Sequence, residues 1–453
     1  MQRRRRRLLG VVGVAAVGGL AGCTTSSTDT STGGPSESTG GPSGNTKLLP
    51  ESVGKNDRMG NDLALSADGT TAIVGAVGDV TTADDTGQAF LFEWDGEAWN
   101  QVAEITPDEP DAPGLLGFSV ALSADGSTAL VGVPAGARES GPPTGTVYVL
   151  TNDGEEWTRE TELTSARQRP GERFGLSAAL SADGTTALVG ANPLSRERPN
   201  DYLDGSAHVL ERVDGTWEHR ARLTAADRED AHQFGMTAAL SGDGTTALLG
   251  ATDDTNENGD EAGAAYVFAD DNGSWSQQAK LLAEGGESNG QFGSAVALSS
   301  DGTLALLGDY LDDTDTGENS GSVSVFEADG GSWTQQATVV PDAVDANSRF
   351  GSSVALSPDG TRALVGSQNG ERSEQDGEQI VAGAVHLLET DGSGWTQREK
   401  YAAVAGRAIP DSFGTTVDIS RDGKTGLVGA TQDPEQGLTS GAAYVVDLSD
   451  GSN

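Results

Sequence analysis

From about residue 46 onward, short apolar runs alternate with polar segments, as in Ala187–Gly190 and Ala264–Phe268. No stretch shows a sustained 3.6-residue apolar period, which an amphipathic helix would require. Short apolar runs bounded by Gly, Asp, Asn and Ser are typical of β-strands joined by tight turns. The pattern therefore predicts an all-β chain.

The dipeptide Asp-Gly marks a repeat in this pattern. Its Asp recurs at Asp68, Asp125, Asp183, Asp243, Asp301, Asp359 and Asp422, at intervals of 57, 58, 60, 58, 58 and 63 residues. Nine residues before each Asp stands a large apolar residue followed by Gly, namely Met59, Leu116, Phe174, Phe234, Phe292, Phe350 and Phe413. Seven residues after each Asp stands another Gly, namely Gly75, Gly132, Gly190, Gly250, Gly308, Gly366 and Gly429. These fixed positions indicate one structural unit repeated seven times.

Each unit divides into four short strands. The Ser-x-Asp-Gly segment suits a tight hairpin between the first two strands, because Gly adopts the positive φ that such turns need. A long polar loop precedes the third strand, and a second turn leads to the fourth, which begins at Trp99, Trp157, Trp217, Trp275, Trp333 or Trp395. Seven four-stranded units predict a seven-bladed β-propeller.

The two ends of the repeat region indicate how the ring closes. The last unit ends after its third strand, at Tyr444–Val446, and has no strand that begins with Trp. Leu48 lies eleven residues before Met59, just as Leu281 lies eleven residues before Phe292. We therefore expect residues 46–49 to supply the outer strand of the seventh blade.

The order Phe-Gly, apolar strand, Asp-Gly and then Gly-Ala resembles the FG-GAP repeat of integrin α-subunit propellers and their bacterial and archaeal relatives. The resemblance covers about residues 46–447 and implies a seven-bladed propeller on a cell surface, engaged in adhesion or recognition. Many integrin-type repeats carry a calcium loop between the first two strands. Here that place holds a tight turn with one carboxylate, as at Ser181–Thr185, which cannot supply six to eight oxygen ligands. We therefore expect the recurrent Asp to be a turn residue.

The charge balance narrows the choice of partners and of environment. The chain has 69 acidic and 28 basic residues, for a net charge of −41. Nucleic acid is an improbable partner, because binding phosphates requires clustered Lys and Arg. An acidic, lysine-poor surface resembles that of proteins from extreme halophiles, in which high salt screens the repulsion between carboxylates.

The first 45 residues predict export and lipid anchoring. Arg3–Arg7 precede a short apolar stretch that ends at Leu20-Ala21-Gly22-Cys23, which is the layout of a signal peptide. The segment resembles a twin-arginine signal followed by a lipobox, and this resemblance implies cleavage before Cys23 and lipidation of its thiol. The alternative is an uncleaved N-terminal anchor. We expect a signal peptide at 1–22, a disordered spacer at 23–45 that begins with the lipidated Cys23, and the propeller at 46–453.

Binding residues are expected in the long loops on the face opposite the Asp-Gly turns, since variable loops on a rigid scaffold commonly carry function. Those loops are 77–86, 133–144, 192–204, 252–262, 310–320 and 367–382. Two of them contain acidic clusters that are candidates for binding Ca²⁺, and the alternative is solvated surface acids. The candidate ligands are Asp254, Asn256, Asn258, Asp260, Asp312, Asp313 and Asp315.

The sequence contains no recognisable catalytic constellation and predicts no cofactor besides Ca²⁺. His208 and His386 occupy the same repeat position as Tyr148, Tyr266 and Tyr444, which favours a packing role for both. The favoured interpretation is a monomeric, lipid-anchored recognition or adhesion module at the outer face of the cell membrane, with a surface protein or glycan as its partner. The alternatives are an envelope scaffold and an extracytoplasmic polymer-acting enzyme with its site at the central funnel.

Overall fold

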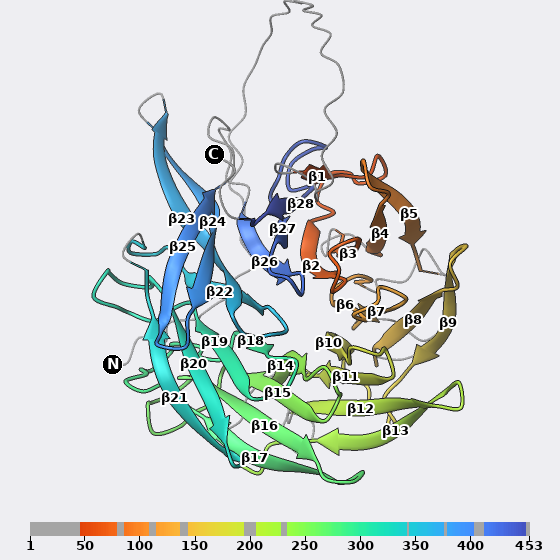
Figure 1. Ribbon diagram of the computed structural model, residues 1–453, viewed down its shortest axis with the longest axis horizontal. Helices are drawn as coiled ribbons and strands as arrows, with labels where there is room; N and C mark the ends of the chain where they lie inside the picture. Colours follow the sequence, from red (N-terminus) through yellow and green to blue (C-terminus); the bar gives the residue numbers. More distant parts are fainter. Residues whose placement is uncertain are drawn as a thin grey trace, which may run out of the picture. The chain divides into compact units, whose positions relative to one another are not determined.

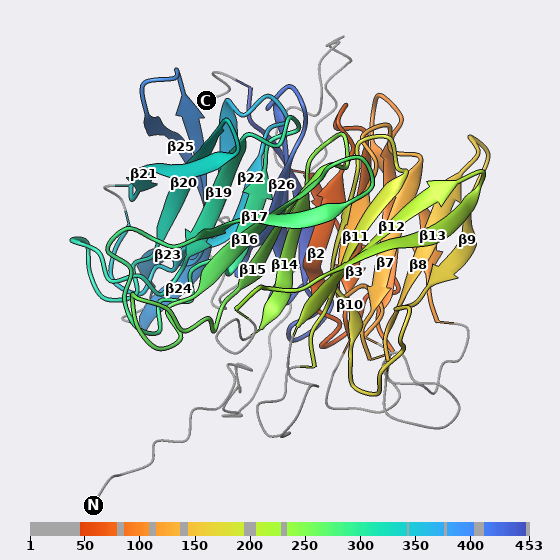
Figure 2. The same cartoon turned by 90° about the horizontal axis from the view of Figure 1, so that it is seen from below.

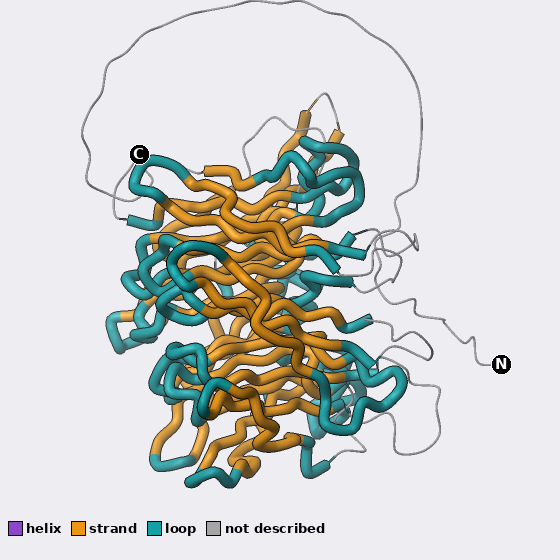
Figure 3. The backbone as a smooth tube through the Cα atoms, turned by 90° about the vertical axis from the view of Figure 1, so that its right-hand side faces the viewer, coloured by secondary structure: helices purple, strands orange, loops and turns teal. Residues whose placement is uncertain are grey.

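The computed structural model describes residues 46–78, 86–107, 115–135, 144–193, 205–227, 233–341, 344–375, 378–402 and 412–449. Within these ranges the chain forms strands and turns and no helix (Figure 3). The strands make seven four-stranded antiparallel sheets, which are the seven blades of a β-propeller (Figure 1). The predicted fold class is confirmed.

In blades 1 to 6 the four strands run in sequence order from the centre of the ring outward, and in blade 7 the first three do so (Figure 1). The inner strands are β2 (Met59–Leu65), β6 (Val120–Leu122), β10 (Phe174–Leu180), β14 (Phe234–Leu240), β18 (Ala295–Leu298), β22 (Phe350–Leu356) and β26 (Phe413–Ile419). The second strands are β3 (Thr71–Ala76), β7 (Thr128–Val133), β11 (Thr186–Ala191), β15 (Thr246–Ala251), β19 (Leu304–Asp309), β23 (Arg362–Gln375) and β27 (Thr425–Ala430).

The third strands are β4 (Gln88–Trp94), β8 (Thr146–Asn152), β12 (Ser206–Val213), β16 (Ala264–Asp270), β20 (Ser322–Asp329), β24 (Glu378–Thr390) and β28 (Ala442–Asp447). The outer strands of blades 1 to 6 are β5 (Trp99–Ile105), β9 (Trp157–Leu163), β13 (Thr216–Leu223), β17 (Trp275–Leu281), β21 (Ser332–Val339) and β25 (Trp395–Ala402). The outer strand of blade 7 is β1 (Thr46–Leu48), which pairs antiparallel with β28. The first strand of the repeat region thus completes the last blade, as the sequence predicts.

The hydrophobic core consists of seven clusters, one between each pair of neighbouring blades. The cluster between blades 3 and 4, for example, joins Val209 and Leu223 to Phe234 and Leu249. The large apolar residue that precedes the first Gly of each repeat, at or just before the inner strand, is almost completely buried. The Trp that opens an outer strand packs against a cluster from its edge, as Trp275 does here. The repeat positions seen in the sequence are therefore the positions at which one blade packs on the next.

Two recurrent glycines mark the closest contact between blades. A Cβ atom on Gly308 of blade 5 would lie 2.1 Å from the carbonyl oxygen of Gly351 in blade 6. Gly351 itself has a φ of 85°, a conformation that L-residues with side chains seldom adopt. The Phe-Gly and Gly-Ala parts of the repeat therefore place glycines where the backbones of adjacent blades are in contact and leave no room for a side chain.

The Ser-x-Asp-Gly turns form one face of the ring, which we call the turn face. In blade 3, the Asp183 Oδ1 accepts hydrogen bonds from the Ser181 hydroxyl at 2.7 Å and from the Thr185 hydroxyl at 2.8 Å. Although burial opposes the effect, these hydroxyl groups lower the pKa of Asp183 below its ordinary value. The same bonds recur in the other turns, with the Ser127 hydroxyl in place of the Thr hydroxyl in blade 2. In blade 7 the residue is Lys424, which donates a hydrogen bond to Asp422 through its backbone amide alone. The recurrent Asp is therefore turn chemistry, as expected.

A second set of bonds links these turns into a circle. The amide of the residue after each turn Ser donates to the carbonyl of the equivalent residue in the next blade. This bond is 2.9 Å long from Ala124 to Ala182 and 2.8 Å long from Arg421 to Ala67, across the seam of the ring. The circle has one break, at Pro358, which has no N–H to donate. Backbone pairing at the turn face therefore joins the blades almost all the way round.

The connections between second and third strands, and those between blades, form the opposite face, which we call the loop face (Figure 2). One of the expected loops, 367–382, differs from the prediction. Strands β23 and β24 continue through it as an extended hairpin, with Glu371 paired to Ala382 and Gln375 paired to Glu378.

Candidate functional site

The loop of blade 4 between β15 and β16 is tied to the blade by a buried carboxylate. The Asp254 side chain is fully buried, and its Oδ1 lies 2.9 Å from the Lys280 Nζ. The Tyr266 hydroxyl donates to the Asp254 Oδ2 at 2.6 Å. Asp227 completes the group, at 2.6 Å from the Lys280 Nζ. Although burial opposes the effect, the hydrogen bonds that Lys280 donates to both carboxylates raise its pKa above the ordinary value.

Blade 7 repeats this arrangement with residues from the two ends of the repeat region. The Asp433 Oδ1 lies 2.8 Å from the Nζ of Lys47 in β1. The Tyr444 hydroxyl donates to the Asp433 Oδ2 at 2.6 Å. Burial alone would raise the pKa of Asp433, but the bonds from Lys47 and Tyr444 bring it below its ordinary value. The strand that closes the ring therefore also supplies the counter-ion of a buried loop carboxylate.

The other predicted ligands in the blade 4 loop are engaged with the backbone or exposed. The Asn256 amide donates to the Asp254 Oδ1 at 3.0 Å and to the Gly263 carbonyl at 2.9 Å. The Asn258 amide donates to the Ala283 carbonyl at 2.8 Å. The side chain of Asp260 is exposed. Since a lysine already neutralises Asp254, a cation would have to displace it, and binding of Ca²⁺ to this loop stays a prediction.

The loop of blade 5 between β19 and β20 separates its predicted ligands. Asp313 and Asp315 are exposed, and the Asp313 Oδ1 accepts a hydrogen bond at 2.7 Å from the backbone amide of Asn319. Asp312 is partly buried, and burial raises its pKa, against the effect of a hydrogen bond with Ser322. The same loop begins at Asp309, which is 3% exposed and is absent from the predicted set. The structure thus brings Asp312 to the side of a buried carboxyl and leaves Asp313 and Asp315 in solvent.

Two more acidic residues missed by the sequence analysis lie on neighbouring inner strands. The Asp418 Oδ2 of blade 7 accepts a hydrogen bond at 2.7 Å from the Leu65 amide of blade 1. The Asp62 Oδ2 of blade 1 accepts one at 2.8 Å from the Val120 amide of blade 2. Burial raises the pKa of Asp62 to about 7 and that of Asp418 to about 6. Both carboxyls therefore have pKa values raised toward neutral pH, and each joins its blade to the next one, Asp418 from blade 7 to blade 1 and Asp62 from blade 1 to blade 2.

These two residues could have been found by aligning the repeats. The position of Asp62 holds Ser or Thr in five other blades and Ala in blade 5. Where the position holds Ser or Thr, the hydroxyl donates to a glycine carbonyl of the next blade, as from Ser177 to Gly235 at 2.9 Å. The position of Asp418 holds Ala in all other blades. A single acid in a column of small residues is the signal that was available.

His208 and His386 are confirmed as packing residues. The His208 ring centre lies 5.4 Å from that of Phe174, and the His386 ring centre lies 5.1 Å from that of Phe350. Tyr266 stands in the same relation to Phe234, at 5.4 Å. Burial lowers the pKa of His208, against the effect of the neighbouring Glu172. The imidazole therefore acts as a neutral core side chain.

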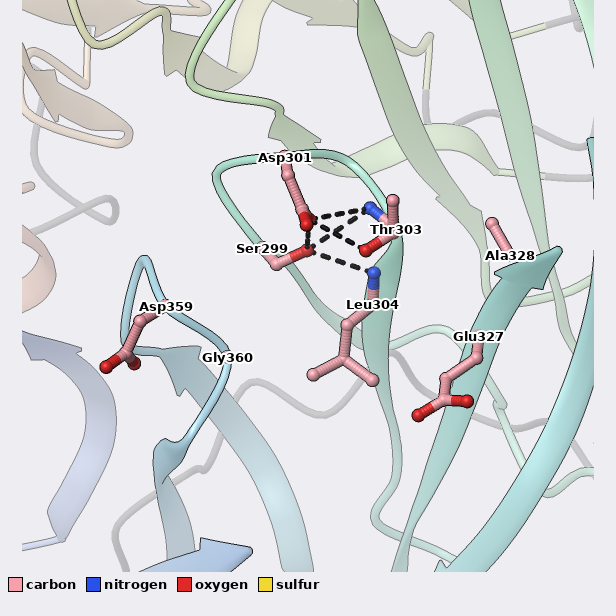
Figure 4. A pocket seen from close by; sticks show the side chains of 8 residues that line it. All are labelled: Ser299, Asp301, Thr303, Leu304, Glu327, Ala328, Asp359 and Gly360. Atoms are coloured by element: carbon pink, nitrogen blue, oxygen red, sulfur yellow. Dashed lines mark hydrogen bonds between the residues drawn. The ribbon is translucent and has the colours of Figure 1, made fainter. Parts of the chain in front are cut away.

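A hollow of about 290 Å³ lies on the turn face between blades 5 and 6 (Figure 4). Its wall includes the turn carboxylates Asp301 and Asp359 and the β20 residue Glu327. Leu304 stands here at a position that is Thr in five other blades. Figure 4 shows that the Asp301 carboxylate points back into its own turn, where its Oδ1 accepts from Ser299 at 2.6 Å. The hollow is thus a gap between two structural turns.

The remaining predicted site residue, Cys23, lies outside the described residues, as do the leader and the spacer. Across the described ranges, no group of three or more His, Cys, Asp or Glu side chains is arranged to hold a metal ion. In that same part of the chain, no helix is long and apolar enough to cross a membrane.

Comparison with known families identifies FG-GAP repeats in the second half of the chain. Residues 217–268, 275–326, 333–388 and 395–446 each match the FG-GAP repeat. Every match begins at the Trp of one outer strand and ends in the third strand of the next blade. No curated protein matches the chain. FG-GAP β-propellers are in general protein-interaction or adhesion modules.

Proposed function

We propose that this protein is an exported, lipid-anchored recognition module that binds a surface protein or glycan through its loop face. Export and lipidation are supported by Arg3–Arg7 and by Leu20-Ala21-Gly22-Cys23, and the Ser/Thr/Gly-rich segment 24–45 would act as a tether. The FG-GAP repeats support the binding role. The high negative charge suits a protein that works in concentrated salt.

One observation carries the assignment to the loop face, namely the contrast between the two faces. On the turn face, side-chain oxygens are consumed by bonds within the turns, as at Asp183. On the loop face, the loops differ from blade to blade in sequence and length, and their acids include exposed ones such as Glu257 and Asp315. Leu438, in the blade 7 loop, is 41% exposed, which is unusual for a large apolar side chain in the described part of the chain. Variable chemistry on a rigid base is what a binding surface requires.

The proposal is tested by cross-linking the full-length protein to its partner on intact cells at native salt. Cross-links should join the partner to peptides from the loop face, such as 252–262, 310–320 and 431–440. Cross-links confined to the outer strands or the Ser-x-Asp-Gly turns would contradict the assignment to the loop face. The absence of a lipid on Cys23 in the mature protein, measured by mass spectrometry, would contradict the anchoring.

An enzyme that acts on an envelope polymer is the second candidate, and Asp62 and Asp418 are the observation that favours it. Carboxyl groups with pKa values of about 7 and about 6 are suited to general acid–base catalysis. Both groups are held by backbone amides, which is also the geometry of a structural cap. Release of reducing ends from envelope polysaccharide, abolished by Asp62→Asn and Asp418→Asn, would support the enzyme. The absence of such release from the unmodified full chain would exclude this activity.

A further inference from the structure

The fourth residue after the second-strand Gly is an Asp in blades 1, 4, 5 and 7, and that of blade 1, Asp79, lies outside the described residues. In blades 4 and 7 this Asp is balanced by a Lys from the outer strand and a Tyr from the third strand. The Tyr and Lys stand opposite each other in the strand register, as Tyr266 with Lys280 and Tyr444 with Lys47. This three-residue group fixes the base of the loop in both blades.

Blade 5 has the Asp without the rest of the group. The register pair that corresponds to Tyr266 and Lys280 is Ser324 with Thr338. Neither replacement carries a positive charge, and both are much shorter than the residues that they replace. The carboxylate of Asp312 therefore faces a position at which blades 4 and 7 place an ammonium group.

A second carboxyl lies in the same loop, held by the backbone amides of Leu311 and Asp312 and with no cationic side chain among the groups that shift its pKa. Asp309 is 3% exposed, and its Oδ1 has no hydrogen-bond partner. The equivalent residues in blades 4 and 7 are Ala251 and Ala430, so the acid is peculiar to blade 5. Gly290 makes room for it, since a Cβ atom there would lie 2.9 Å from the Asp309 Oδ2. The Asp312 backbone amide donates to the Asp309 carbonyl at 3.3 Å, so the two acids belong to one tight turn.

We propose that blade 5 binds one hard divalent cation of the Ca²⁺ type between Asp309 and Asp312, in the place of the missing lysine. Two carboxylates balance a charge of +2, and oxygen ligands suit Ca²⁺. Asp309 supplies an unused buried oxygen. The Ser324 and Thr338 hydroxyls accept hydrogen bonds from the Gln335 side-chain amide at 3.1 and 2.8 Å, so a neutral amide stands near the place that an ammonium group takes in blades 4 and 7. The site lies between the second and third strands, away from the Asp-Gly turns, and of the acidic cluster predicted from sequence it uses only Asp312.

The experiment is calorimetric titration of the full-length protein with CaCl₂, after treatment with chelator and in concentrated KCl to suppress non-specific binding. The expected result is one tight site that is absent in Asp309→Ser, which introduces the residue found at this position in blade 6, Ser367. Asp315→Asn removes an exposed acid from the same loop and should leave the affinity unchanged.

A charge-replacement variant separates loss of the site from loss of the fold. Ser324→Tyr with Thr338→Lys would rebuild in blade 5 the group found in blades 4 and 7. This variant should lose Ca²⁺ binding and should melt, without Ca²⁺, at a temperature no lower than that of the Ca²⁺-bound wild type. Absence of a tight site in the wild type, an unchanged affinity in Asp309→Ser, or equal loss in Asp315→Asn would each overturn the proposal.

Discussion

The turn face and the loop face of the ring use acidic residues in opposite ways. On the turn face, the same Asp occupies the same place in all seven blades and accepts hydrogen bonds from its own turn. On the loop face, the acids differ between blades, and equivalent ones have different partners. Asp254 and Asp433 are paired with lysines, whereas Asp312 stands where no lysine is available.

This difference separates repeat positions that stabilise the fold from positions at which a binding function can be placed. The same residue recurs in every blade where the backbone geometry requires it, namely at the turns and at the contacts between blades. Such residues stabilise the ring. Departures from the repeat occur where the fold does not dictate the residue, and these are the positions at which ligand chemistry can be placed. Asp62, Asp309 and Asp418 are departures of this kind.

The largest effect is expected from removing the strand that closes the ring, on which both faces depend. Deletion of residues 24–55 removes β1, leaves β28 as an open edge and exposes the core around Val445. Cooperative thermal unfolding should be lost or shifted far downward. Deletion of 24–45 alone should leave the melting temperature unchanged. Equal melting temperatures for the two truncations would show that β1 does not close the ring.

The next largest effect is expected at the base of the blade 7 loop. Lys47→Met leaves the buried Asp433 without its counter-ion, which costs about 3–5 kcal/mol in comparable buried pairs. Lys55→Met, at an exposed position nearby, is the matched control and should be neutral. Chemical denaturation measures both. A change of less than about 1 kcal/mol in Lys47→Met would mean that the ion pair does not anchor the loop.

Stability should fall as pH rises from about 4 to about 7, because burial raises the pKa of Asp62 from 3.8 to about 7 and that of Asp418 from 3.8 to about 6. The native state holds protons in this range that the unfolded state has released. The stability that each group contributes is therefore complete below its unfolded pKa and is lost as pH rises through its folded pKa. The slope is at most about 1.4 kcal/mol per pH unit for one proton. Asp62→Ser should flatten this slope, whereas Glu257→Gln should not. Parallel pH profiles for wild type and Asp62→Ser would contradict the assignment.

The fold followed from the sequence because its repeated residues act locally or at fixed offsets. Asp183 bonds to Ser181 and Thr185, two residues away, and the need for Gly at Gly351 follows from its own φ. The candidate sites were harder to predict. The partner of Asp254 is Lys280, which reaches it through a loop conformation that no local pattern specifies. Asp309 gave only a weak signal, an acid in a column of small residues.

A smaller and direct comparison of the faces uses one acid from each. Asp183→Ala removes an acceptor of several hydrogen bonds on the turn face and should cost roughly 1–2 kcal/mol. Glu257→Ala, on the loop face, should change stability by less than about 0.5 kcal/mol. Denaturant midpoints of the two variants decide the point. A larger loss in Glu257→Ala would reverse the roles given to the two faces.

The central claim, that the loop face binds the partner, is tested most directly by the affinity of the full-length protein for intact cells. Leu438 on the loop face and Val102 on the outer strand β5 are similarly exposed apolar residues, at 41% and 43%. Leu438→Asp should weaken binding by about tenfold or more, equivalent to ~1.4 kcal/mol, while Val102→Asp binds like the wild type. Loss of binding in Val102→Asp together with full binding in Leu438→Asp would contradict the claim.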